Sequence, residues 1–173
     1  MDIFVANKNA QKLNKVTDYM WMTIAGGVAD AQYLVDLVRA QCRLFKLKRG
    51  YDMPVKSAAR LLSNVLFQNK FTPYEVGLLL GGVTPGGGPG LYDLGAYGSI
   101  LPEKYASTGS GSVFALGVLE TEWEEGMSLQ ACKEVCVRAV TSAVVRDMAS
   151  GNGIDVVVIT AEGSEFEAVA VPR

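Results

Sequence analysis

Pairs of helices constrain the fold of this chain more than any other feature of its sequence. In the first half, apolar residues recur at helical spacing from Ala31 to Phe45 and again from Val55 to Leu66, and a basic turn that contains Gly50 joins the two segments. In the second half, the spacing predicts a third helix from Val113 to Glu122 and a fourth that begins after Ser128, a residue type that often caps helices. We therefore expect one helix pair in each half.

Short segments with strand character lie between and around these helices. Strands and helices do not alternate regularly, as they would in a doubly wound parallel fold. The pattern instead predicts an α+β layered sandwich, in which helices cover the outer faces of sheets. The expected strands run from Met20 to Ala25, Glu75 to Gly81, Leu91 to Leu94, Ser99 to Leu101, Ile154 to Thr160 and Phe166 to Val171.

A glycine-rich run from Thr84 to Gly90 lies between two of the expected strands. It lacks the Lys-Ser/Thr pair of a P-loop, and a strand is expected to follow it, so no helix N-terminus is there to receive an anion. We interpret the run as a flexible hairpin loop rather than a nucleotide-binding loop.

Length and composition favour a single domain over residues 1–173. Nearly half of the 173 residues are hydrophobic, and the net charge is -2. A net charge this close to zero argues against electrostatic binding of nucleic acid. No apolar stretch is long enough to span a bilayer, and the residues after Met1 lack the apolar core of a signal peptide, so we expect a cytoplasmic protein with no membrane partner.

Histidine is absent from the sequence, which removes the usual general base of Ser-His and Cys-His hydrolases. Any nucleophilic chemistry must therefore use another base. Of the three cysteines, Cys132 and Cys136 are spaced to share one face of a helix, and Cys42 lies far from them in the sequence. We interpret them as reduced core thiols, because a zinc site would need further ligands. Neither a metal nor another cofactor is expected.

Four local motifs, in order along the chain, carry a resemblance to a known family. They are NKNAQKL at Asn7 to Leu13, MTIAGGVADAQ at Met22 to Gln32, YASTGSGS at Tyr105 to Ser112, and RDMASGNGIDVVVIT at Arg146 to Thr160. Essentially the whole chain resembles a beta-type proteasome subunit of the archaeal type, a threonine protease among the N-terminal nucleophile hydrolases. The resemblance implies a four-layer α-β-β-α sandwich, a seven-membered ring of beta-type subunits stacked on alpha-type subunits, and unfolded polypeptide as substrate.

The resemblance also implies the residues of a catalytic site. In the family, the hydroxyl of a free N-terminal threonine attacks the peptide carbonyl, and the threonine's own amino group helps to carry the proton. Lys12 matches the lysine beside that threonine, and Gly26 matches the backbone N–H donor to the oxyanion. Ser110, Asp147 and Ser150 match the set that hydrogen-bonds around the terminal amine.

Three apolar residues match the family positions that line the pocket for the side chain before the cut bond, namely Ala10, Ile24 and Val28. An intact subunit is therefore expected to prefer cleavage after hydrophobic residues. Without the family, Lys12 would be interpreted as a solvated turn lysine, Ser110 as a turn serine and Asp147 as a residue near a helix end.

The sequence departs from the family at its beginning. In the family, the threonine and the acidic partner of the lysine lie on an opening hairpin of two strands, which would precede Met1. Met1 has no proton to lose, and Thr17 and Thr23 have no free amine, so we expect the chain as written to be inactive. Three explanations stay open. They are a start assigned at an internal methionine or an incomplete sequence, a short inactive ring subunit with a structural role, and a stand-alone protein that has reused the sandwich.

Overall fold

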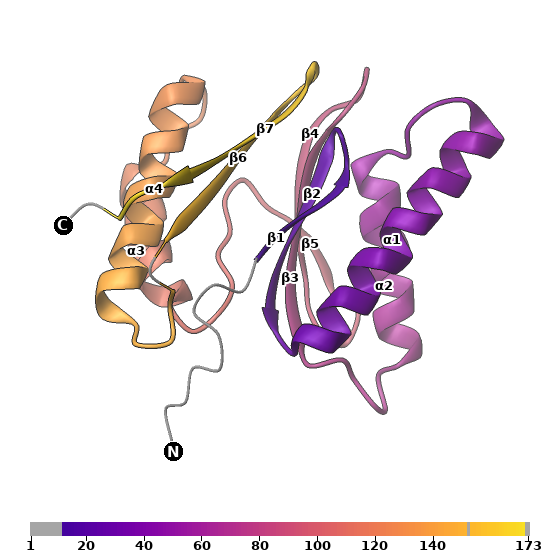
Figure 1. Ribbon diagram of the computed structural model, residues 1–173, viewed down its shortest axis with the longest axis horizontal. Coiled ribbons are helices and arrows are strands. Elements are labelled where there is room, and N and C mark those ends of the chain that lie inside the picture. Colours follow the sequence, from indigo (N-terminus) through magenta and orange to yellow (C-terminus); the bar gives the residue numbers. More distant parts are fainter. Residues whose placement is uncertain (1–11, 152, 172–173) are drawn as a thin grey trace. The chain divides into compact units, whose positions relative to one another are not determined.

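The structure, a computed structural model, describes residues 12–151 and 153–171 (Figure 1). These residues contain four helices and seven strands, which confirms the predicted α+β class. They form two compact units. The N-terminal unit consists of Lys12–Ala106 and Ile159–Ser164, and the C-terminal unit of Ser107–Val158 and the residues from Glu165 onward. That residues 1–173 fold as one domain stays a prediction.

An antiparallel sheet of five strands dominates the N-terminal unit, and its strands lie side by side in sequence order. Strand β1 was not among the expected strands. Its own sequence mixes polar and apolar residues and gives no clear strand signal. The strand forms through pairing with β2, in which Leu13 lies opposite Thr23 and Lys15 lies opposite Trp21. The strands are β1 Leu13–Thr17, β2 Met20–Gly26, β3 Val76–Thr84, β4 Gly88–Leu94 and β5 Ile100–Pro102.

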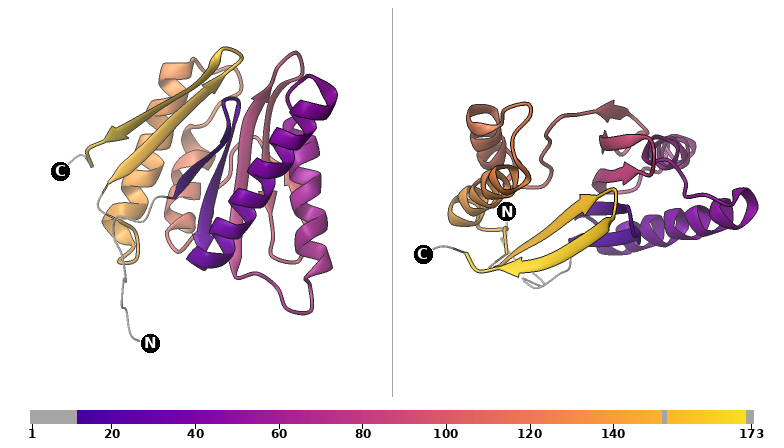
Figure 2. Two further views of the ribbon diagram at one scale, coloured as in Figure 1. Left: turned by 45° about the vertical axis from the view of Figure 1, so that its right-hand side comes forward. Right: turned by 90° about the horizontal axis from the view of Figure 1, so that it is seen from above.

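Helices α1 (Val28–Arg49) and α2 (Val55–Gln68) cover one face of this sheet (Figures 1 and 2). Their predicted apolar faces are confirmed, because those side chains are buried against Met20, Met22, Leu78 and Leu80 of the sheet. The buried helix residues include Ala31, Leu34, Val35, Val38 and Cys42 from α1, and Ala58, Ala59, Leu62 and Leu66 from α2.

Local backbone chemistry fixes the ends of both helices. Gly50 ends α1 in the left-handed region at φ 78°, and its N–H donates to the Lys46 carbonyl at 2.8 Å. Pro54 is the N-cap residue of α2, since its ψ of 142° is extended rather than helical. The first free N–H of α2, that of Val55, donates to the hydroxyl of Thr84 at 3.0 Å.

The glycine-rich run forms a hairpin, as predicted, but most of it is strand. Only residues 85–87 form the turn. Thr84 pairs with Gly88, and Gly82 pairs with Gly90, so the second half of the run belongs to β4. Gly86 and Gly88 supply the positive φ angles of 74° and 81° that the turn needs.

The C-terminal unit contains the second helix pair, α3 (Ser112–Glu122) and α4 (Leu129–Arg146), together with most of the hairpin of β6 (Ile154–Thr160) and β7 (Gly163–Val169). The predicted cap of α4 is confirmed, because Ser128 Oγ accepts the Ala131 N–H at 3.2 Å. An ion pair of 2.6 Å between Lys133 and Glu167 joins α4 to β7. Each half of the chain thus contributes one helix pair, as expected.

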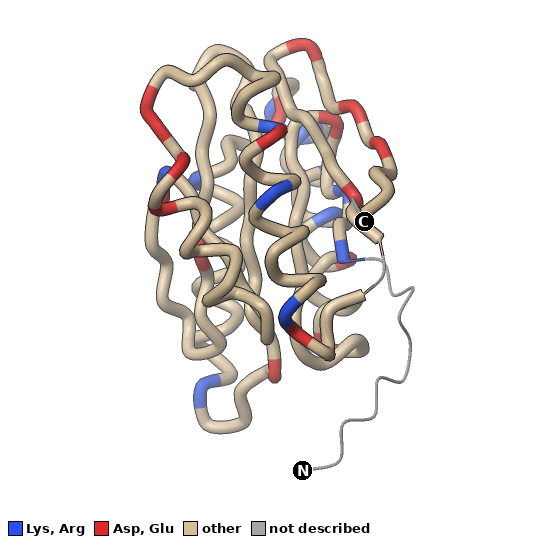
Figure 3. Tube along the Cα trace, turned by 90° about the vertical axis from the view of Figure 1, so that its left-hand side faces the viewer, with Lys and Arg blue, Asp and Glu red and all other residues tan. Residues whose placement is uncertain are grey.

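The tip of the β6–β7 hairpin is held to the N-terminal sheet. The indole nitrogen of Trp21, on β2, donates to Ser164 Oγ at 2.9 Å, and these two residues of the N-terminal unit are 143 positions apart in the sequence. Basic and acidic residues are interspersed along the described trace (Figure 3). None of the helices in the described residues is long and apolar enough to cross a membrane.

Candidate catalytic site

Asp147 is the centre of a polar cluster in the C-terminal unit. It directly follows α4, and its own N–H donates to the Ala143 carbonyl at 2.8 Å, which fixes its backbone. The hydroxyl of Ser110 donates to Asp147 Oδ2 at 2.6 Å, and the hydroxyl of Ser150 donates to the same oxygen at 2.7 Å. The structure therefore brings together three of the five residues predicted for the catalytic site.

The two hydroxyls stabilise the ionised form of the Asp147 carboxyl. The hydrogen bond from Ser110, followed by that from Ser150, lowers the pKa of the Asp147 carboxyl below its ordinary 3.8. Because both hydroxyls donate their protons to the carboxylate, their oxygens keep lone pairs that can accept. The cluster can thus receive a hydrogen-bond donor, and it favours a cationic one such as an ammonium group.

A glycine allows Ser110 to approach α4. A side chain at Gly111 would place a Cβ 2.8 Å from the Cβ of Ala143 and 3.0 Å from the Ser150 hydroxyl. Distances this short are rarely found between real side chains, so the glycine is required for the turn before α3 to pack closely. The GSG sequence around Ser110 is therefore explained by packing as well as by chemistry.

Gly26, the predicted oxyanion donor, lies at the exposed end of β2 in a conformation that favours glycine. Its φ is 101°, and an added Cβ would collide with the carbonyl oxygen of Glu75. It pairs with Val76 at the start of β3, and the next residue, Gly27, donates its N–H to the Glu75 carbonyl at 2.7 Å. The backbone at Gly26 is thus fixed on both sides.

Lys12 lies beside β2 in the same unit as Gly26. Its carbonyl accepts the Ile24 N–H at 3.0 Å, and the residue is exposed. Ile24 packs against the core under the helices, whereas Val28, the first residue of α1, is 58% exposed. The third residue of the predicted specificity pocket, Ala10, lies outside the described residues. The assembly of Lys12 and Gly26 with Asp147 into one site stays a prediction.

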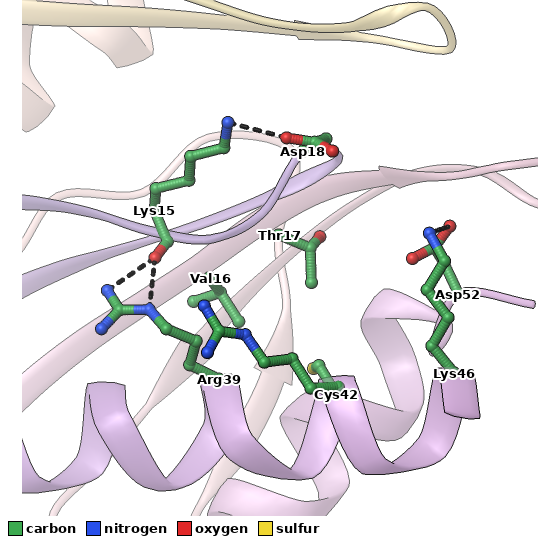
Figure 4. A pocket seen from close by; sticks show the side chains of 9 residues that line it. Lys15, Val16, Thr17, Asp18, Arg39, Cys42, Lys46 and Asp52 are labelled. Carbon is green, nitrogen blue, oxygen red and sulfur yellow. Dashed lines mark hydrogen bonds and ion pairs between the residues drawn. The ribbon is translucent and has the colours of Figure 1, made fainter. Parts of the chain in front are cut away.

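A cavity of about 440 Å³ lies between β1 and α1, and none of the predicted site residues lines it. Its basic side chains are largely paired, since Lys15 lies 2.7 Å from Asp18 and Lys46 lies 3.0 Å from Asp52. The Arg39 side chain donates twice to the Lys15 carbonyl, at 2.8 and 3.2 Å, and thereby joins α1 to β1 (Figure 4). Most of the polar side chains that line the cavity are thus accounted for by contacts within the fold.

The helices and antiparallel sheets agree with the α+β sandwich class expected from the sequence. Comparison with known proteins makes the assignment narrower. The chain belongs to the proteasome family, because the family model described as "Proteasome subunit" matches residues 1–159.

Relatives in that family include beta-type subunits. The chain is 46% identical to a proteasome subunit beta of Methanocorpusculum labreanum, over 96% of this chain and 78% of the relative. It is 44% identical to that of Thermoplasma acidophilum, over 92% and 75%, and 43% identical to that of Haloferax volcanii, over 96% and 68%. These similarities support a beta subunit of a core particle, which assembles with other proteasome subunits.

Proposed function

We propose that this beta-type subunit hydrolyses peptide bonds of unfolded polypeptides by the threonine mechanism. The observation that carries the proposal is the hydrogen-bonded cluster of Ser110, Asp147 and Ser150, in a chain whose relatives are proteasome beta subunits. A seven-membered beta-type ring, stacked on an alpha-type ring in the cytoplasm, would enclose the site.

The proposed chemistry assigns one role to each part of the site. The threonine hydroxyl oxygen bonds to the carbonyl carbon, and its proton passes through the threonine's own amino group to the leaving amine. Lys12 lowers the proton affinity of the threonine through its positive charge. The Gly26 N–H donates to the oxyanion, and the Asp147 cluster holds the terminal amine. Water then releases the acyl group.

The threonine mechanism requires a nucleophile with a free terminal amine. We propose that the threonine and an acidic partner of Lys12 lie together on a hairpin, as in the family that the chain resembles. Ala10, Ile24 and Val28 would favour a hydrophobic side chain before the cut bond. The mechanism needs no cofactor.

The test uses the full-length subunit co-assembled with an alpha-type subunit. Hydrolysis of a peptide with a hydrophobic residue before the cut bond is measured for the wild type, Lys12→Ala and Lys15→Ala. We expect Lys12→Ala to lower kcat by about 100-fold or more, because proton transfer to the amine depends on it. Lys15→Ala is the matched control. Lys15 lies on β1, shortly after Lys12 in the sequence, and its side chain pairs with Asp18.

A second candidate function is a structural ring subunit without catalytic duty. A wild-type particle that assembles fully but cleaves no peptide would establish this alternative and overturn the enzymatic proposal. Equal activity of the wild type and Lys12→Ala would overturn the role of Lys12.

A further inference from the structure

A carboxylate on α1 is connected to the backbone next to Gly26. Asp30 Oδ2 accepts the N–H of Glu75 at 3.0 Å, and the carbonyl of the same Glu75 accepts the N–H of Gly27 at 2.7 Å. Asp30 thus contacts Glu75 directly, and Glu75 contacts the backbone that follows Gly26. All four residues belong to the N-terminal unit.

This arrangement supplies a helix cap that the sequence of α1 does not provide. Gly27 is the N-cap residue and has no side chain with which to accept a hydrogen bond. In an ordinary capping box, the third helical residue reaches back to the N-cap N–H. Here Asp30, at that third position, reaches Glu75 instead, and the Glu75 carbonyl accepts the N–H of Gly27.

The position of the Glu75 carbonyl determines the conformation of Gly26. That oxygen lies where the Cβ of any other residue at position 26 would be, and Gly26 is held at φ 101°. A stack between Tyr33 of α1 and Tyr74, with ring centroids 6.0 Å apart, also holds this segment against the helix. Movement of Glu75 would therefore change the direction of the Gly26 N–H.

We propose that Asp30 is a positioning residue, which acts through the Glu75 peptide to hold the Gly26 N–H in the direction that the oxyanion needs. The proposal rests on the proposed function for its catalytic part. The Asp30–Glu75–Gly27 linkage itself does not depend on that function. Oxyanion donors must be oriented before the reaction, so a small displacement lowers the rate without changing ground-state binding.

Asp30 also carries a negative charge in the first turn of α1, which by itself stabilises a helix N-terminus. Two substitutions separate this charge from the position of the acceptor. Asp30→Asn keeps an oxygen acceptor at the same distance from the backbone but removes the charge. Asp30→Glu keeps the charge but moves the carboxylate by one methylene.

The experiment measures kcat and KM of the assembled full-length particle with the same peptide. We expect Asp30→Glu to lower kcat about tenfold with KM changed less than about twofold, and Asp30→Asn to stay within about threefold of the wild type. Asp36→Asn is the matched control, because Asp36 lies on the same helix and pairs with Arg39 at 2.7 Å. The reverse order, with Asn impaired and Glu active, would assign Asp30 to the helix charge and overturn the proposal.

Amide hydrogen exchange gives a readout that does not require activity. In the same particles, we expect the amides of Gly27 and Glu75 to exchange at least about tenfold faster in Asp30→Glu than in the wild type, and at the wild-type rate in Asp36→Asn. Unchanged exchange in Asp30→Glu would overturn the linkage. If the wild type is inactive while this exchange pattern is found, the proposed enzymatic function fails and the linkage stands.

Discussion

Ser110 donates a hydrogen bond of 2.6 Å to Asp147 from 37 positions away in the sequence. The bond joins the turn before α3 to the end of α4 within the C-terminal unit. Ser150, three residues after Asp147, donates to the same oxygen. One carboxylate therefore fixes two chain segments, and its ionisation has measurable consequences.

The first of these consequences is a pH dependence of stability. Because the pKa of Asp147 is lowered in the folded chain, its two hydrogen bonds stabilise the fold above the ordinary pKa of 3.8. That contribution is lost as the pH falls through the lower folded value. We expect Ser110→Ala to raise the pKa of Asp147 toward 3.8, as measured by NMR titration of its carboxyl carbon. The urea midpoint of Ser110→Ala should differ from the midpoint of the wild type more at pH 7 than at pH 3.

Ser128→Ala is the control for this titration. This substitution removes the hydroxyl that caps α4 by accepting the Ala131 N–H, and no carboxylate takes part in that bond. It should lower the free energy of unfolding by about 1 kcal/mol at both pH values. A Ser110→Ala effect that is equally independent of pH would contradict the assigned role of Asp147.

Gly26→Ala should destabilise the chain more than an ordinary glycine substitution. The new Cβ would meet the Glu75 carbonyl, and the φ of 101° is unfavourable for alanine, so we expect a loss of about 3 kcal/mol or more in the free energy of unfolding. Gly86→Ala is the matched control, because its φ is 74° and no atom lies within 4 Å of the added Cβ. It should cost about 1–2 kcal/mol. Equal losses in denaturant unfolding would show that the collision with Glu75 is relieved.

Thr84→Val should weaken the start of α2. Valine has nearly the same shape as threonine but cannot accept the Val55 N–H, so we expect a loss of about 1 kcal/mol in the free energy of unfolding. Thr121→Val, whose hydroxyl bonds only to carbonyls of its own helix, should change it by less than about 0.5 kcal/mol. A wild-type value for Thr84→Val would mean that the Val55 N–H finds another acceptor.

The sequence predicted the elements whose signals are local. The periodicities of α1 and α2 and the cap at Ser128 depend on residues a few positions apart, and each was found where expected. Strand β1 was missed because it depends on pairing with β2. The strand from Phe166 to Val171 was placed late, since β7 begins at Gly163, directly after the two-residue turn.

The site was predicted only in part for the same reason. Spacing alone gave no signal that Ser110 would meet Asp147, and their pairing was expected solely from the family motifs. Asp30 was missed, although a signal exists in hindsight. An acidic residue three positions after the second glycine of a Gly-Gly pair at a helix start can complete a cap through another segment.

The bond between Trp21 and Ser164 has a consequence for how the chain is made. Synthesis proceeds from the N-terminus, and domains generally begin to fold as they emerge from the ribosome. Trp21 emerges early, but its partner serine is translated 143 codons later. The five-stranded sheet is therefore fully translated by Pro102, but the contact that fixes the β6–β7 hairpin to β2 can form only after Ser164 has been made.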